Sequence, residues 1–402
     1  MAMAMAAMKV LFVVPRYGTE VVGGAETAAR LLAEHLARLA GWEVSVATTA
    51  AKDFVTWADE YPPGREWING VKVDRYASEH GRLPDFHPLS AALLADPTSA
   101  TGEEADRWLE YQGPYCPELV EAVVTAEADV VVFYPYLYFP TVRAIGRVRV
   151  PAVLHPAAHD EPALRLPIFP AVYDAADALV FQTRAERRLV EHAFPVAHHR
   201  QLLLGLGVDD PDEVGSTVGG NPPGSGQRTP YLVCLGRVDR MKGSFLLASW
   251  FARYKRRRPG PLRLVYAGPL VEAPPDHGDV DVLGVVDDAT KWSLLAGATA
   301  LVSPSPFEAF SLVVAEAWSA RCPVLVNAAC GPTVEQCLRS GGGLVFGGYG
   351  AFEAALDRLS ADPVVRDRLG ANGRHYVAGR YRWPVVVERY ARFLEETVAR
   401  SR

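Results

Sequence analysis

The 402-residue sequence lacks the features that mark several broad classes of protein. No charge-free run is long enough to span a bilayer, which argues against a membrane-spanning helix. The five cysteines are odd in number and show no Cys-x2-Cys spacing, so the sequence indicates neither a disulfide framework nor a zinc-binding pattern. The net charge of -6 gives no reason to expect a nucleic-acid partner. We therefore expect a cytoplasmic protein with reduced cysteines.

The first eight residues also lack the parts of a signal peptide. They are methionines and alanines with neither a basic flank nor a long apolar core, and a native start at Met8 would fit the sequence. The length and an apolar fraction of 49% predict two globular domains, each with its own core.

The order strand, loop, helix, strand occurs twice, over residues 9–48 and again over residues 231–267. Two such openings half a chain apart predict two doubly wound α/β domains. Between them, residues 210–228 are rich in Gly, Pro and Ser, which is typical of an exposed linker. The predicted boundaries are 1–212 for the first domain, 213–229 for the linker and 230–380 for the second domain.

Two carboxylates stand eight residues apart in the second half, at Glu308 and Glu316. Glu308 lies in a loop after a short apolar strand, and Glu316 lies in a helix whose other members are apolar. Such a helix should be buried, and an unpartnered carboxylate there would cost several kcal/mol. We therefore expect a partner for Glu316, supplied either by the fold or by a ligand's hydroxyl groups.

A glycine-bracketed loop with two cations follows the first strand of the second domain. Gly236 and Gly243 permit close backbone approach, and a predicted helix starts directly after them. The helix N-terminus favours negative charge, and Arg237 and Lys242 add positive charge beside it. This combination suits a diphosphate.

Together the patterns Gly-Arg-x4-Lys-Gly and Glu-x7-Glu resemble the donor site of retaining family 4 glycosyltransferases, or glycosyl transferases group 1. Further pieces stand in the same order, so the resemblance covers nearly the whole chain: Gly23-Gly24-Ala-Glu26, His159-Asp160, and residues 181–186 and 207–209. It implies the GT-B fold, in which two Rossmann-like domains face each other across a cleft. It also implies that the last helix, residues 381–402, crosses back onto the N-terminal, acceptor-binding domain.

The resemblance implies roles for individual residues. Glu316 would contact the ribose and Glu308 the transferred sugar, while His159 would face that sugar and be oriented by Asp160. The catalytic set would be His159, Arg237, Lys242 and Glu308. The donor-binding set would be Gly23, Gly24, Gly236, Arg237, Lys242, Glu308, Phe310, Ser311, Leu312 and Glu316.

Plainer interpretations stand beside these roles. Arg237 and Lys242 could belong to a solvated turn, Glu316 could pair with an arginine, and His159 could be structural. Ala309 and Ser311 stand where glycines are commoner, which leaves the donor sugar open. The aromatic residues 133–139 could stack an acceptor sugar or pack in the core. Residues 52–115 could also hold acceptor specificity.

No metal and no cofactor are expected. Asp279-Val-Asp281 has the Asp-x-Asp pattern of metal-dependent glycosyltransferases of another fold, but it begins a predicted strand instead of ending one. His155 and His159 are four residues apart, yet Pro156 argues against a helix that would bring them together. The cations of the second domain can neutralise a diphosphate without a divalent ion.

The sequence thus predicts a retaining, metal-independent hexosyltransferase. Its donor would be a UDP- or GDP-linked sugar, and its acceptor a small molecule or glycan, such as a glycoside or glycoconjugate. Membrane contact is compatible with the sequence but not indicated by it. A sugar-nucleotide epimerase of the same fold and a non-catalytic nucleotide-sugar binding protein are the alternatives.

Overall fold

The computed structural model describes residues 8–21, 23–212 and 229–401. The chain divides into two compact units, which we describe separately. Unit 1 comprises Met1–Leu206 and Val386–Arg402, and unit 2 comprises Gly207–Val385. The predicted linker, residues 213–229, lies outside the described residues except for Thr229.

Unit 1 is built on an eight-stranded sheet of order β3-β4-β2-β1-β5-β6-β7-β8. Only the β3–β4 pair is antiparallel. The strands are β1 (Lys9–Val13), β2 (Glu43–Thr49), β3 (Gly64–Ile68), β4 (Val71–Tyr76), β5 (Val130–Phe133), β6 (Ala152–Leu154), β7 (Ala178–Phe181) and β8 (Arg200–Leu203). The central strands are apolar and buried on both faces, which is typical of parallel sheets.

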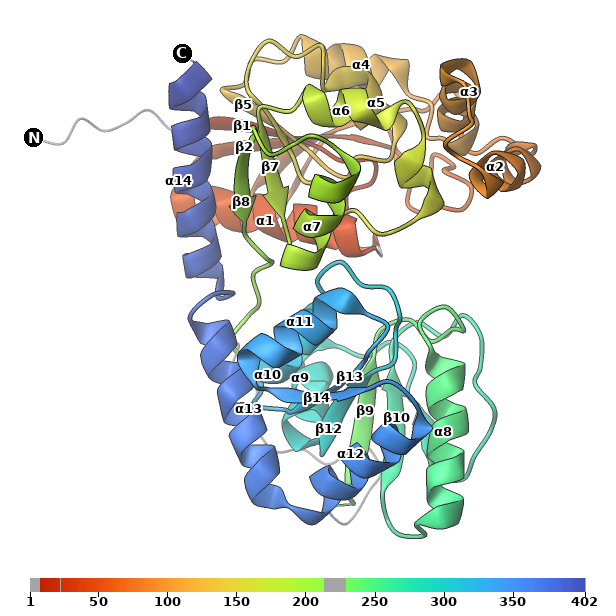
Figure 1. Ribbon diagram of the computed structural model, residues 1–402. Helices are drawn as coiled ribbons and strands as arrows, with labels where there is room; N and C mark the ends of the chain where they lie inside the picture. The colour runs from red at the N-terminus through yellow and green to blue at the C-terminus, as the bar shows by residue number, and fades with distance from the viewer. Residues whose placement is uncertain (1–7, 22, 213–228, 402) are drawn as a thin grey trace, which may run out of the picture. The chain divides into compact units, whose positions relative to one another are not determined.

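Helices cover this sheet (Figure 1). They are α1 (Gly24–Ala40), α2 (Phe86–Ala95), α3 (Gly102–Gln112), α4 (Pro117–Val124), α5 (Phe139–Ala144), the 3-10 helix η1 (Pro162–Arg165), α6 (Phe169–Asp174) and α7 (Arg184–Ala193). One large apolar cluster joins α3, α4, α5 and α6 to alternate residues of the central strands, such as Leu11, Val131 and Phe133.

Unit 2 has the predicted order of elements around a six-stranded parallel sheet, β11-β10-β9-β12-β13-β14. Its strands are β9 (Tyr231–Leu235), β10 (Arg263–Ala267), β11 (Val280–Val282), β12 (Ala300–Ser303), β13 (Val324–Asn327) and β14 (Gly343–Phe346). Its helices are α8 (Ser244–Arg257), α9 (Asp288–Gly297), α10 (Leu312–Ser319), α11 (Gly331–Ser340), α12 (Tyr349–Ala361) and α13 (Pro363–Ala378). The two doubly wound sheets confirm the predicted fold class.

One hairpin was not predicted from the sequence. The strands β3 and β4 lie in residues 52–115 and are joined by Asn69-Gly70, where both residues have positive φ. Asn-Gly between alternating residues is a strong hairpin signal, so the sequence did contain the information.

The last helix, α14 (Trp383–Ser401), begins in unit 2 and continues in unit 1. In unit 1 the hydroxyl of Tyr390 lies 2.8 Å from Nε2 of His155, and the guanidinium of Arg389 donates to the carbonyl oxygens of Leu203 and Leu204. These contacts fix the helix against the ends of β6 and β8.

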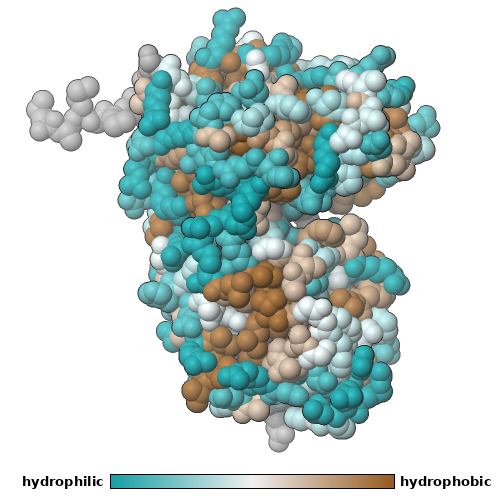
Figure 2. Space-filling model, viewed as in Figure 1, coloured by the Kyte–Doolittle hydropathy of each residue, from teal (hydrophilic) through white to brown (hydrophobic). Residues whose placement is uncertain are grey.

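No helix in the described part of the chain is long and apolar enough to cross a membrane. All five cysteines are buried and free. Figure 2 shows a patch of hydrophobic residues on the viewed face of unit 2.

Candidate active site

The sheet order of unit 2 places two of the predicted loops at a topological switch point. In unit 2 the chain runs outward from β9 to β10 and β11 and then returns to β12 on the other side of β9. Loops after two such strands diverge and leave room for a ligand at their carboxyl ends. Gly236 to Gly243 follow β9, and Glu308 follows β12, so both loops flank this point.

The loop after β9 depends on its two glycines. Gly236 has φ +110 and Gly243 has φ +79, a region of backbone conformation that disfavours other residues. A Cβ atom on Gly243 would also lie 2.6 Å from the carbonyl oxygen of Pro304. The two loops therefore approach each other closely only because residue 243 has no side chain.

A buried carboxylate, Asp239, holds this loop in shape. Its Oδ1 accepts a hydrogen bond of 2.6 Å from the backbone N–H of Lys242, and its Oδ2 accepts one from Nε of Arg237. Asp239 is only 7% exposed, whereas Arg237 and Lys242 keep about a third of their side chains exposed. The two predicted phosphate-binding cations are thus anchored on one side and open on the other.

Lys242 and Glu308 come together as predicted members of one site. The ammonium of Lys242 donates to Oε1 of Glu308 across 2.7 Å, which joins the loop after β9 to the loop after β12. An ammonium has three donors, so this contact leaves further protons for another acceptor.

Glu316 has a partner within the protein, and that partner is a lysine. Nζ of Lys291 lies 2.8 Å from Oε1 of Glu316 and 2.9 Å from Oδ1 of Asp288. The expectation of a wholly buried helix was wrong, because Leu312, Val313 and Glu316 lie on a partly exposed face of α10. Packing against β12, β13 and α13 buries only the opposite face, with Trp318 at its centre.

The N-terminus of α10 carries an unusual backbone. Ser311 precedes the helix with φ +66, a conformation that suits glycine, and its hydroxyl is buried without a partner in the described residues. No side chain caps α10. Phe310 is buried beside it and Leu312 begins the helix. A free helix N-terminus of this kind favours an anion.

In unit 1 the glycine pair lies at the start of α1, after β1. A Cβ on Gly24 would meet no atom within 4 Å, whereas a Cβ on Gly23 would lie 2.2 Å from Oε2 of Glu26. Glu26 forms a buried ion pair with Arg16, and Arg16 also donates to the carbonyl oxygen of Lys52 across 2.8 Å. This pair fixes the loop between β1 and α1.

The loop after β6 holds His159, which is partly exposed. Asp160 does not orient it, contrary to our expectation, because Asp160 is exposed and pairs with Arg165 across 2.6 Å. The acid near His159 is Glu161, which the sequence analysis missed. Burial raises the pKa of Glu161, while His159 and a hydrogen bond from Tyr136 lower it.

Glu186, on α7, holds the loop that carries His159. Its carboxylate accepts hydrogen bonds from the backbone N–H of Ala158 at 3.1 Å and of Gln182 at 2.7 Å. Burial raises the pKa of Glu186 to about 7, although these backbone donors act in the opposite direction. The sequence showed Glu186 only as part of a family pattern, and its contact with residue 158 follows from the fold.

Most of the aromatic stretch packs in the core. Tyr134 stacks on His155, and Tyr136 packs edge-on against Phe169. Only Leu137 and Tyr138 within residues 133–139 are partly exposed. A continuous stacking platform for an acceptor sugar is therefore absent from this stretch.

The Asp-x-Asp pattern is occupied by ion pairs at the start of β11. Asp281 accepts two hydrogen bonds of 2.7 Å from Arg263, and Asp279 lies 3.3 Å from the ammonium of Lys255. These carboxylates are thus held by cations of the same domain.

Residues 221–376 match the family model described as glycosyl transferases group 1. A GDP-mannose-dependent alpha-(1-6)-phosphatidylinositol monomannoside mannosyltransferase of Mycobacterium tuberculosis is 28% identical over 284 residues, which cover 64% of this chain and 72% of that protein.

Two solved structures of low identity resemble the chain. Sucrose-phosphate synthase of Thermosynechococcus elongatus has a TM-score of 0.68 at 18% identity, covering 98% of this chain and 100% of its own. A structure described as trehalose-6-phosphate from E. coli bound with UDP-2-fluoro glucose has a TM-score of 0.69 at 12% identity. The match covers 96% of this chain and 99% of that one. They confirm the expected GT-B fold.

Proposed function

We propose that the chain is a glycosyltransferase of the GT-B fold that transfers a hexose from a nucleotide-diphosphate sugar with retention of configuration, since residues 221–376 match the glycosyl transferases group 1. The observation that carries the proposal is the meeting of two loops at the switch point of unit 2. There Arg237 and Lys242 project beside the N-terminus of α8, and Lys242 contacts Glu308.

In this proposal Arg237 and Lys242 bind the diphosphate of the donor. Asp239 holds the side chain of Arg237 and the backbone of Lys242, and both cations are about one third exposed, so little reorganisation is needed when negative charge develops on the leaving diphosphate. The uncapped N-terminus of α10 at Ser311 and Leu312 would add backbone donors.

Glu308 and Glu316 would bind hydroxyl groups of the donor. Each already lies within hydrogen-bonding distance of a lysine ammonium, which orients the carboxylate as a hydrogen-bond acceptor. Glu308 would meet the transferred sugar and Glu316 the ribose. The M. tuberculosis relative uses GDP-mannose, whereas the E. coli structure holds a UDP-sugar, so both bases belong in the test.

His159 and the Gly23-Gly24 loop of unit 1 would complete the reaction by contacting the donor and the acceptor, a glycoside or glycoconjugate. Glu161 and Glu186 position the loop that carries His159. With the protein's own cations on the diphosphate, transfer should persist in excess EDTA.

The test is product analysis with a panel of UDP- and GDP-sugars and glycoside acceptors. A new α-linked glycoside from an α-linked donor is expected, whereas an altered sugar nucleotide would indicate an epimerase and an unchanged one a binding protein. Arg237→Ala and Lys242→Ala should each lower kcat at least about a hundredfold.

Arg240→Ala is the matched control for these variants. Arg240 lies in the same loop, but it is exposed and pairs with Glu272 across 2.7 Å, so kcat should stay near that of the wild type. Near-normal turnover in both the Arg237 and Lys242 variants would contradict the donor site.

A further inference from the structure

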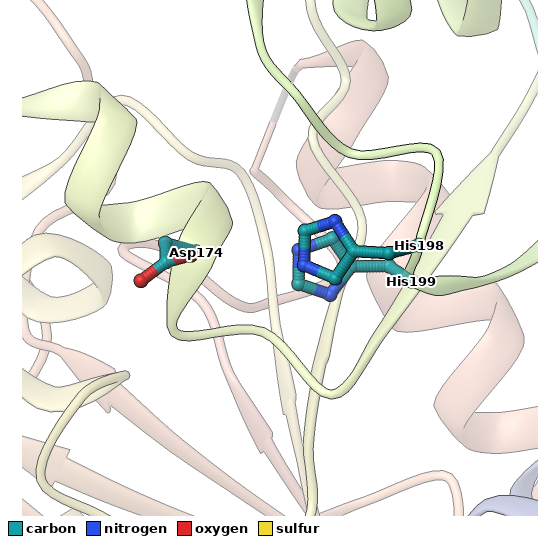
Figure 3. A group of neighbouring side chains, drawn as sticks. All are labelled: Asp174, His198 and His199. Carbon is teal, nitrogen blue, oxygen red and sulfur yellow. The ribbon is translucent and has the colours of Figure 1, made fainter.

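Three side chains with metal-binding atoms gather outside the candidate active site, in unit 1. Asp174 is the last residue of α6, and His198 and His199 directly precede β8. One potential ligand atom of each residue lies within 4.8 Å of the other two. In Figure 3 the two imidazole rings overlap in the view and extend toward Asp174. Their ring centroids lie 3.9 Å apart.

This cluster lies at the opposite ends of the unit 1 strands from His159. β6, β7 and β8 are parallel, so residues that precede β8 lie at the amino ends of the strands. His159 follows the carboxyl end of β6. A ligand bound at the cluster therefore serves a purpose other than sugar transfer.

One of the nitrogen atoms has no partner of its own. Nε2 of His199 is buried and makes no hydrogen bond within the described residues, which is costly for a polar atom. His199 and Asp174 also line a hollow of about 270 Å³, together with Tyr173, whose buried hydroxyl likewise has no partner there. The site thus has room and an unused ligand atom.

We propose that Asp174, His198 and His199 form a Zn²⁺ site, with water as the fourth ligand. Two imidazoles and a carboxylate are a common donor set for Zn²⁺. Ligand atoms around a tetrahedral zinc lie about 3.4 Å apart, given Zn–N bonds of about 2.0–2.1 Å. Asp174 and His198 are exposed, so rotation of their side chains would bring the ligand atoms to this distance.

A bound ion would tie the end of α6 to the start of β8. These segments are separated along the chain by β7 and α7, so the ion would act as a crosslink within unit 1. Because metal binding to the folded state adds to folding free energy, such a crosslink would stabilise unit 1.

The experiment is a calorimetric titration of the full-length chain, without an affinity tag, with ZnCl2 at pH 7.5. One equivalent should bind, and Mg²⁺ should not compete because it prefers oxygen ligands. His198→Ala and Asp174→Asn should each weaken the affinity at least about tenfold. His192→Ala, an exposed histidine on α7 outside the cluster, is the matched control and should bind as the wild type does.

A second measurement is the midpoint of thermal unfolding. Zn²⁺ should raise it for the wild type and for His192→Ala, but not for His198→Ala. Both substituted cluster positions are exposed, so these variants should fold. No binding by the wild type, or equal affinity in wild type and His198→Ala, would overturn the proposal.

Discussion

The two units place the charged side chains of their loops differently. In unit 1, Arg16 and Glu26 beside the glycine pair keep only 4% and 8% of their side chains exposed. In unit 2, Lys242 and Glu308 keep 36% and 18%. The same strand, loop and helix arrangement therefore uses charge in two ways.

Burial explains the difference in use. A buried ion pair fixes a loop because neither partner can turn to water without leaving the other uncompensated. A partly exposed ion pair such as Lys242 with Glu308 contributes little to stability but can contact a ligand. Substitutions in unit 1 should therefore change stability first, and substitutions in unit 2 should change turnover first.

The largest expected effect on stability is that of Arg16→Ala. It leaves Glu26 charged and buried, and we expect a loss of about 3–5 kcal/mol in the free energy of unfolding, measured with urea. Lys242→Ala should lose less than about 1 kcal/mol. The double variant Arg16→Met with Glu26→Leu should recover most of the loss, since it removes both charges. Equal losses in Arg16→Ala and Lys242→Ala would end the contrast between the units.

The pH dependence of unit 1 gives the next effect. The pKa of Glu186 is about 7 in the folded chain against 4.5 as its ordinary value, so the folded state binds more protons between these pH values. The carboxyl should therefore cost stability progressively as pH rises from about 4.5 to 7, by about 3 kcal/mol in full.

Glu186→Gln isolates this contribution. Between pH 5 and pH 8 the wild type should lose stability relative to this variant, while Glu191→Gln, an exposed position on the same helix, should follow the wild type. The buried His155 changes stability in the opposite direction. Because burial lowers its pKa to about 3, the protein loses stability as the pH falls below 6.5. That contribution is common to all three proteins and cancels in the differences. Parallel pH curves would refute the assignment.

Substitutions at Gly23 and Gly24 distinguish the effect of side-chain packing on stability from the effect of backbone freedom. Gly23→Ala places a Cβ against Glu26 and should cost about 1–3 kcal/mol of unfolding free energy. Gly24→Ala meets open space in the first turn of α1 and should gain up to about 1 kcal/mol. Urea unfolding measures both, and changes of the same sign would show that the buried pair does not restrict residue 23.

Ser311 offers the smallest effect, in unit 2. Ser311→Gly should gain roughly 0.5–1 kcal/mol in thermal or urea unfolding, because φ +66 disfavours serine. Ser249→Gly, in the exposed helical interior of α8, should lose about as much. A loss at both positions would show that the buried hydroxyl of Ser311 has a stabilising role.

Local pattern was enough to predict most elements of both sheets. Apolar runs such as residues 130–133 and 231–235 are too short for buried helices, which favours strands buried on both faces, and predicted helices separate them. The β3–β4 hairpin was not predicted, although Asn69-Gly70 marks its turn. The role of Asp239 in holding the loop after β9 was not predicted, because a single acid within a basic loop forms no recognisable sequence pattern.

The sequence by itself determined the doubly wound fold and the pairing of glycines with cations after β9, because strand periodicity, glycine and charge are properties of neighbouring residues. Only the tertiary structure decided which acid meets which base. Lys242 and Glu308 are 66 residues apart, and Lys291 and Glu316 are 25 apart. Such contacts arise where strands distant in sequence become neighbours in a sheet, and so do the contact of Glu186 with Ala158 and the approach of Asp174 to His199.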